Sequence, residues 1–249
     1  MIKLSTYVTS VTLFMLSLLI TFQASAQWHE KSFHVMGTQA KVQFWYEDSQ
    51  KSILLISAVE AEMERINQTM SPYIKTSDLS VINQSAASHP VKISTELFNL
   101  LKAANDISDL SHGAFDITYA SVGYQYQYRN KIKPNEQAIT DNLNKINYQG
   151  IILDQQKQTV SFSVKGMKID LGGIAKGYAV KNCLTLLKNA GVKHGLVSAG
   201  GDTGLLGDKH GRPWVVGIKH PRADNKMAVH LPLVNEAIST SGDYERYFI

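Results

Sequence analysis

The sequence predicts an α+β protein, because strand-type and helix-type apolar patterns both occur and follow one another along the chain. Apolar residues alternate with polar ones at Val160, Phe162 and Val164, which is the pattern of a strand with one buried face. Apolar residues then recur at helical spacing from Ile174 to Ala190. A second amphipathic stripe of helical spacing lies earlier in the chain, so helices and strands are both required.

Length and composition exclude several classes of protein. The chain has 249 residues, enough for one large domain or two closely packed lobes. Hydrophobic residues make up 44% and charged residues 18%, which is typical of a globular chain. The formal net charge is +4, and the basic residues are scattered rather than interleaved with aromatic ones. Nucleic acid is therefore not expected as a partner.

The first 26 residues resemble a secretory leader. Lys3 precedes an apolar run from Val11 to Phe22, which ends at the small residues 24–26. We expect a signal peptide at residues 1–26 and a periplasmic mature protein at 27–249. The apolar run is short for a membrane span, which needs roughly 20 residues. Because no cysteine lies near the cleavage point, a lipid anchor is not expected.

The next elements follow from local pattern. Residues 33–46 predict a strand pair broken near Gly37, and residues 53–70 predict an amphipathic helix with its buried stripe beginning at Ile53. Ser94 is expected to cap another helix, with His112 in its last turn and Gly113 as its stop. Pro134 is expected to open a short helix that runs to Ile146 and leads into a strand at 150–153.

The central stretch, residues 169–180, places chemistry at a turn. Ile169 and Leu171 are expected to continue a strand, so that Asp170 precedes Gly172 and Gly173 where a helix begins. Amides at a helix N-terminus attract phosphate, glycine permits close approach, and Lys176 adds a positive charge. Asp170 would then hold a ribose hydroxyl or a metal. An ordinary turn, with Asp170 capping the helix and Lys176 in solvent, explains the pattern without a ligand, and geometry alone leaves both open.

The last part predicts more strands. Residues 196–202 read as a strand ending in a glycine turn, in which Asp202 is either a functional carboxylate or a turn residue. Residues 212–218 and 227–231 read as consecutive strands. The single cysteine, Cys183, lies among apolar neighbours and is expected in the core. The eight histidines form no short-range ligand pair, so a zinc site is not indicated.

Several segments, in order from Met36 to Phe248, resemble the ApbE family of FAD:protein FMN transferases. The central stretch Asp-Leu-Gly-Gly-Ile-Ala-Lys-Gly-Tyr-Ala-Val is similar to the family's central motif. The other matching segments are Met36-Gly37-Thr38, Ser71-Pro72-Tyr73, residues 77–83, Gly113 to Thr118, Gly200-Gly201-Asp202 and residues 237–248.

This resemblance implies an ApbE-like (T-fold-like) α+β fold: a two-lobed single domain with mixed or antiparallel sheets and flanking helices. It implies magnesium-dependent cleavage of FAD, with FMN attached to a threonine or serine of a target protein and AMP released. The implied partners are FAD and acceptor proteins that carry the flavinylated residue, such as subunits of membrane redox complexes. It also implies that cofactor-binding residues are Met36, Tyr73, Ala114, Phe115, Asp116, Asp170 and Lys176, and that the Gly173 carbonyl binds Mg²⁺. No catalytic residue is assigned.

The sequence departs from the family pattern at three places. Residues 119–128, which contain four tyrosines, replace a Pro-Leu pair and a Trp-Gly-Phe-Gly-like segment, and offer either a stacking surface or a solvated loop. Lys181 stands where the family usually has aspartate. The family continues past residue 249 with further metal ligands, so we expect a C-terminally incomplete domain whose activity is weak or absent. FAD hydrolysis to FMN and AMP, or FAD binding without turnover, are the alternatives.

Overall fold

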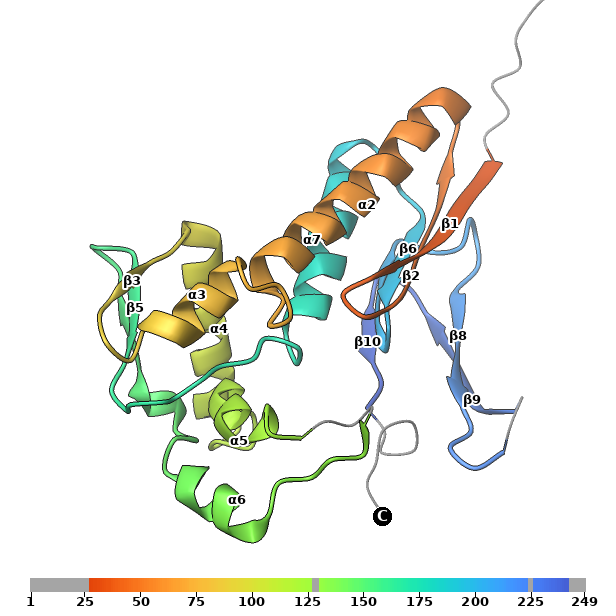
Figure 1. Ribbon diagram of the computed structural model, residues 1–249. Coiled ribbons are helices and arrows are strands. Elements are labelled where there is room, and N and C mark those ends of the chain that lie inside the picture. The colour runs from red at the N-terminus through yellow and green to blue at the C-terminus, as the bar shows by residue number, and fades with distance from the viewer. Residues whose placement is uncertain (1–26, 127–129, 224–225, 242–249) are drawn as a thin grey trace, which may run out of the picture.

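The computed structural model describes residues 27–126, 130–223 and 226–241. A five-stranded antiparallel sheet has the order β1-β2-β6-β7-β10, and helices α2 and α7 pack against it (Figure 1). Helices α3 to α6 and a small antiparallel sheet of order β3-β5-β4 form the other side of the molecule, and β8 and β9 pair only with each other. The expected α+β class is confirmed.

The strand pair expected around Gly37 is a tight hairpin of β1 (Gln27–Val35) and β2 (Thr38–Tyr46). Val35 pairs directly with Thr38, so Met36 and Gly37 alone make the turn, with φ of 54° and 71°. Two consecutive positive φ values match the right-handed twist of the flanking strands. The hairpin therefore fixes Met36 at the tip of the sheet, in a backbone conformation that a residue with a side chain adopts only at some cost.

Two long helices cover the sheet. Helix α2 (Ser49–Met70) begins at the N-cap Asp48, and α7 (Ala175–Asn189) ends before Gly191, whose φ of 89° stops the helix as expected. The buried face of α2 starts at Ser52, which bonds the His29 ring, and not at Ile53, which is 58% exposed. The expected stripe was wrong in its first turn, because that turn meets the polar edge strand β1.

The helical side contains α3 (Asp78–Ser85), α4 (Thr95–Leu110), α5 (Ala120–Gly123) and α6 (Glu136–Leu143). Ser94 caps α4 as expected, but the helix ends at Leu110, and His112 lies beyond it at a φ of 51°. The expected helix to Ile146 stops at Leu143 and fully buries none of its residues. The small sheet is built from β3 (Val91–Lys92), β4 (Ile151–Asp154) and β5 (Thr159–Phe162).

The segment that precedes α7 was expected to be a strand, and this expectation was wrong. Residues 167–171 belong to no sheet, although Ile169 and Leu171 are fully buried. One side chain and the carbonyl of a short 3-10 helix (Ile117–Tyr119) replace the partner strand. Asn83 bonds both the amide and the carbonyl of Ile169, and the Asp170 amide donates to the carbonyl of Ile117. Apolar alternation reports burial here, not strand pairing.

Three later strands lie where they were predicted: β6 (Gly195–Ala199), β8 (Trp214–Lys219) and β9 (Met227–Leu233). Two more, β7 (Asp202–Leu206) and β10 (Ala237–Ser239), were not predicted. Cys183 is fully buried, as expected. Within the described ranges, no helix has the length and apolarity that crossing a membrane requires. The expected leader and the end of the last family segment, residues 242–248, lie outside these ranges.

Candidate functional site

Asp170 organises the turn that leads into α7. One carboxylate oxygen, Oδ1, accepts hydrogen bonds from the Gly172 amide at 2.7 Å and from the Tyr119 hydroxyl at 3.1 Å. The other oxygen, Oδ2, lies 3.0 Å from the Tyr124 hydroxyl. Asp170 is only 8% exposed, and it does not cap α7, which begins five residues later. Its contact with a nucleotide stays a prediction, because a carboxylate has acceptor sites beyond these three donors.

Tyr124 remains a neutral hydrogen-bond donor. Burial raises the pKa of its phenol, and the negative charge of Asp170 raises it further. Its hydroxyl lies 2.9 Å from the carbonyl of Ile169 as well as near Asp170. The Tyr124 hydroxyl therefore holds the turn from one side and stays protonated at any physiological pH.

Lys176 is not free in solvent. Its ammonium donates to the carbonyl of Gly172 one turn back and lies 3.9 Å from the Asp202 carboxylate. Asp202 in turn accepts from the Ser239 hydroxyl at 2.6 Å, so the start of α7 faces the ends of β7 and β10. Ile174, at the N-cap, contributes no side-chain cap to the first turn of α7. Gly172 and Gly173 are exposed, which leaves this end of the helix accessible to an anion.

Two other turns that contain glycine, Met36-Gly37 and Gly200-Gly201, lie close to each other. The Gly200 amide donates to the carbonyl of Gln39, and a Cβ at Gly200 would lie 3.0 Å from the Thr38 hydroxyl. The Met36-Gly37 turn and the Gly200-Gly201 turn are thus neighbours at one end of the strands of the sheet. Thr240 closes the group, because its amide donates to the carbonyl of Gly201.

The predicted residues Ala114, Phe115 and Asp116 approach the same turn from the helical side. A Cβ at Gly173 would lie 3.2 Å from the Phe115 ring, so that ring rests against the paired glycines. Ala114 is exposed. Asp116 accepts from the amide and hydroxyl of Thr118 and from the Tyr148 amide, which makes it the brace of this loop. Phe115 thus lies at the turn, whereas Asp116 is engaged in hydrogen bonds within its own loop region.

Tyr73 lies on the loop between α2 and α3 and is 93% exposed. The loop is fixed by two serines: Ser77 donates to the carbonyl of Ser71, and Ser80 donates to the carbonyl of Ile74. The fixed loop keeps the Tyr73 ring out of the core and available to a ligand. The role of Tyr73 in binding flavin stays a prediction.

A magnesium ion at the Gly173 carbonyl would need several further oxygen ligands. In the described residues, no three His, Cys, Asp or Glu side chains lie close enough together to hold a metal ion. Near Gly173, the Asp202 carboxylate is already paired with Lys176 and Ser239. Mg²⁺ requires about six oxygen ligands, so this set does not form a metal site by itself.

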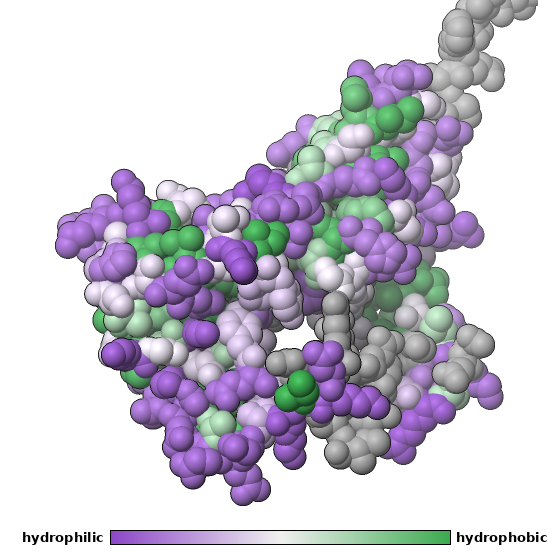
Figure 2. All heavy atoms as spheres, in the orientation of Figure 1, coloured by the Kyte–Doolittle hydropathy of each residue, from purple (hydrophilic) through white to green (hydrophobic). Residues whose placement is uncertain are grey.

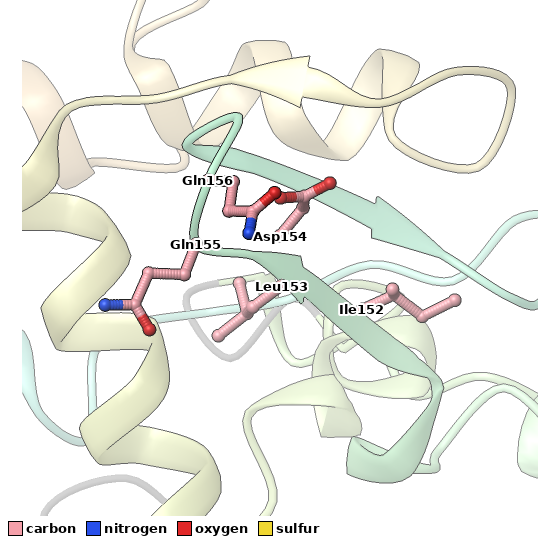
Figure 3. Close-up of a pocket in the computed structure, with 5 residues that line it drawn as sticks. All are labelled: Ile152, Leu153, Asp154, Gln155 and Gln156. Atoms are coloured by element: carbon pink, nitrogen blue, oxygen red, sulfur yellow. The ribbon is translucent and has the colours of Figure 1, made fainter.

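Figure 2 shows an opening between the two sides of the molecule. A separate hollow of about 840 Å³ is lined by residues 152–156, which belong to β4 and its turn (Figure 3). Another, of about 420 Å³, lies between α2 and α7 and is lined by Glu62, Asn182, Thr185, Leu186 and Asn189. Neither includes a residue of the predicted site.

Sequence reasoning missed the residues that support Asp170. Asn83 lies in a segment noted for its family resemblance, but nothing in the local pattern indicates that its amide serves Ile169, 86 residues away. Tyr119 and Tyr124 lie in the tyrosine-rich stretch that was considered as a stacking surface or a solvated loop. Their hydroxyls instead reach Asp170, and the only sequence signal was the concentration of tyrosines.

Comparison with known proteins gives one consistent result. A family model described as the ApbE family matches residues 36–249. A Vibrio cholerae protein named FAD:protein FMN transferase is 29% identical over 243 residues, covering 96% of this chain and 73% of the relative. A Haemophilus influenzae protein of the same name is 29% identical over 200 residues. This chain matches 58% of that relative's length.

Solved structures agree with the sequence comparison. The crystal structure of an ApbE protein from Thermotoga maritima matches with a TM-score of 0.80 and 33% identity, covering 90% of this chain and 73% of the other. The flavin transferase ApbE from Vibrio cholerae matches with a TM-score of 0.77 and 27% identity, covering 88% and 73%. The described fold is therefore similar to solved flavin transferases over most of its length.

Proposed function

This chain belongs to the ApbE family, and from that premise we propose that it is an FAD:protein FMN transferase. The observation that carries the proposal is the meeting of distant segments around one turn. Lys176, which pairs with Asp202, and the Phe115 ring lie beside the exposed Gly172 and Gly173. The Met36-Gly37 turn neighbours the Gly200-Gly201 turn that leads to Asp202. A charged helix start, an aromatic ring and open glycines suit a ligand that has both a pyrophosphate and planar rings.

In the proposed reaction, a threonine or serine hydroxyl of the acceptor protein attacks the phosphorus of the FMN half of FAD. The new bond joins that oxygen to the phosphorus, the pyrophosphate bond breaks, and AMP leaves with the bridging oxygen. The hydroxyl proton passes to a base that we do not assign. Lys176 would reduce the charge repulsion around the pyrophosphate, and a fixed Asp170 would preserve the shape of the turn that receives it.

Magnesium is proposed as a requirement of the reaction on the strength of the family resemblance. The Gly173 carbonyl is the predicted ligand, and the described residues around it do not complete a metal site. We therefore derive no step through the metal. When bound, it would neutralise charge on the phosphates of FAD.

The proposed partners and location follow the same resemblance. We propose that the acceptor is a protein in which a threonine or serine becomes flavinylated, such as a subunit of a membrane redox complex. We propose a periplasmic location, which the leader-like residues 1–26 support. Fractionation of cells that express the tagged chain, with a variant lacking residues 2–26 as the control, tests the location.

The function is tested by incubating the purified chain with FAD, MgCl₂ and a threonine-containing acceptor domain. Transfer adds the mass of FMN to the acceptor and releases AMP, which mass spectrometry and chromatography measure. AMP and free FMN without a modified acceptor would identify a hydrolase. FAD binding without AMP would indicate a protein that binds without turnover, and the absence of FAD binding would overturn the proposal. The expectation of weak activity is tested by the same assay.

A further inference from the structure

Tyr119 and Tyr124 share a feature that the family motifs do not explain. Both hydroxyls bond the carboxylate of Asp170, while the two residues remain 47% and 37% exposed. A tyrosine that only fills the core would have a buried ring. Here the polar end is fixed inside, and part of each ring stays accessible to a ligand.

The backbone that carries the two tyrosines is docked along the segment that leads to the paired glycines. The Asp170 amide donates to the carbonyl of Ile117, and the Lys168 amide donates to the Ser121 hydroxyl at 3.0 Å. The tyrosines are therefore not on an independent loop. Any movement of this segment also moves Asp170 and the turn after it.

The position of the Tyr119 ring is set by a glycine. A Cβ added at Gly123 would lie 2.8 Å from two carbon atoms of that ring, so the ring occupies the space that the missing side chain leaves. One surface of the ring is thus packed against α5. The exposed remainder of the ring is held in one orientation by this packing and by the hydroxyl bond to Asp170.

We propose that Tyr119 and Tyr124 are ligand-binding residues of the same site: their hydroxyls position Asp170, and their exposed rings receive a planar ring of FAD. This inference rests on the proposed function and extends it to residues in the stretch that departs from the family pattern. Stacking on an aromatic side chain suits either the flavin or the adenine, and it adds to binding beyond the area that is buried. Because the hydroxyl already holds one end of each ring, the ring loses little conformational freedom when a ligand stacks on it.

The test measures FAD binding by calorimetry and by the change in flavin fluorescence. Tyr119→Phe and Tyr124→Phe keep the ring and lose the hydroxyl, so each is expected to weaken FAD binding by about three- to tenfold. Tyr119→Leu and Tyr124→Leu lose both the ring and the hydroxyl, and they are expected to weaken FAD binding further. Tyr46→Phe is the matched control, because its hydroxyl donates to the carbonyl of Ala190 at 3.1 Å, away from Asp170. It should bind FAD as the unmodified chain does.

A double-mutant cycle separates positioning from stability. In an Asp170→Asn background, the two Phe substitutions should cause no further loss of FAD affinity, because their effect passes through Asp170. Binding of FMN and of AMP to the Leu variants identifies which ring is received: the half that uses the tyrosines loses affinity. Melting temperatures confirm that each variant is folded. Gly123→Ala, which displaces the Tyr119 ring without removing it, replaces Tyr119→Leu if that variant does not fold.

Three outcomes would contradict all or part of the inference, and they are distinguishable from one another. If the unmodified chain binds FAD and the folded Phe and Leu variants bind it equally well, the tyrosines have no role in binding, and the proposed function stands. If the unmodified chain does not bind FAD, the proposed function is overturned, and this inference with it. Additive losses in the cycle would overturn the positioning of Asp170 by the hydroxyls.

Discussion

The proposed function depends directly on the positive charge of Lys176. Its ammonium is held between the Gly172 carbonyl and Asp202, so its position is fixed before a ligand arrives. A fixed cation loses little conformational entropy when a phosphate binds beside it. The same pairing shows that the earlier alternative, a lysine in solvent, does not describe this residue.

Lys176→Met is expected to weaken FAD binding by about tenfold, because the pyrophosphate loses its nearest cation. Riboflavin, which has no phosphate, should bind both proteins equally. Lys181→Met is the matched control, since Lys181 is exposed on the same helix. Titration calorimetry at two salt concentrations measures the effect. Equal FAD affinity in Lys176→Met and Lys181→Met would exclude a role for Lys176 in binding phosphate.

At the scale of elements, an ion network joins α2, α4 and α7. Arg65 bonds Glu62 on its own helix and Glu96 on α4, while Tyr178 and Asn182 of α7 donate to these two carboxylates. The hydrogen bonds from Arg65 are the largest cause that lowers the pKa of both glutamates. The network fixes α7, and with it the helix start that carries Lys176.

The pH dependence of stability follows from the direction of these shifts. In the folded chain, the pKa values of Glu62 and Glu96 lie below the ordinary carboxyl value of 4.5. These carboxylates therefore stabilise the folded chain above about pH 4.5, and this stabilisation is lost as the pH falls through the lowered pKa. Arg65→Met should therefore reduce the free energy of unfolding by about 1 kcal/mol at neutral pH, a figure reduced for solvent screening. The difference between the two proteins should shrink below about pH 4.

Urea unfolding at several pH values measures this effect. Lys102→Met is the control, because the Lys102–Asp106 pair on α4 is 3.0 Å long but highly exposed on both sides. Its loss should change the unfolding free energy by less than about 0.5 kcal/mol. The interpretation of the Arg65 network would be wrong if the two variants lost the same stability, or if the Arg65→Met difference grew as the pH fell.

At the scale of the whole molecule, Cys183 reports whether the packing of α2 against α7 opens. It is the only cysteine of the chain, it is fully buried, and its thiol lies 3.7 Å from the carbonyl of Val59. Burial raises the pKa of the thiol to about 12, so the folded chain contains almost no thiolate at neutral pH. Reaction with a thiol reagent therefore requires opening of the fold.

We expect the folded chain to react with a thiol reagent far more slowly than the chain in urea. Saturating FAD should slow the reaction further, because a ligand that binds only the folded state stabilises it by mass action. Absorbance of the released thiol product measures the rate, and Cys183→Ala gives the background. Rapid labelling of the native chain would show that α2 and α7 do not pack as described, and an FAD-independent rate would argue against binding to the folded state.

The sequence by itself determined most of the elements and where several of them end. Gly37 allows a tight turn, Ser94 caps a helix, and Gly191 ends a helix in a left-handed conformation. Each of these effects depends only on residues a few positions away. The family resemblance likewise depends on short motifs that are read in order. Such local interactions can be predicted without knowing which distant segments pack against them.

The tertiary structure decided which side chains serve those motifs. The segment before α7 has the alternation of a strand, yet Asn83 and the carbonyl of Ile117 take the place of a neighbouring strand. The Tyr119 and Tyr124 hydroxyls reach a carboxylate about 50 residues away, and Lys176 pairs with Asp202 from another element. Such pairs are set by packing between distant segments, and apolar periodicity within one segment contains no information about them.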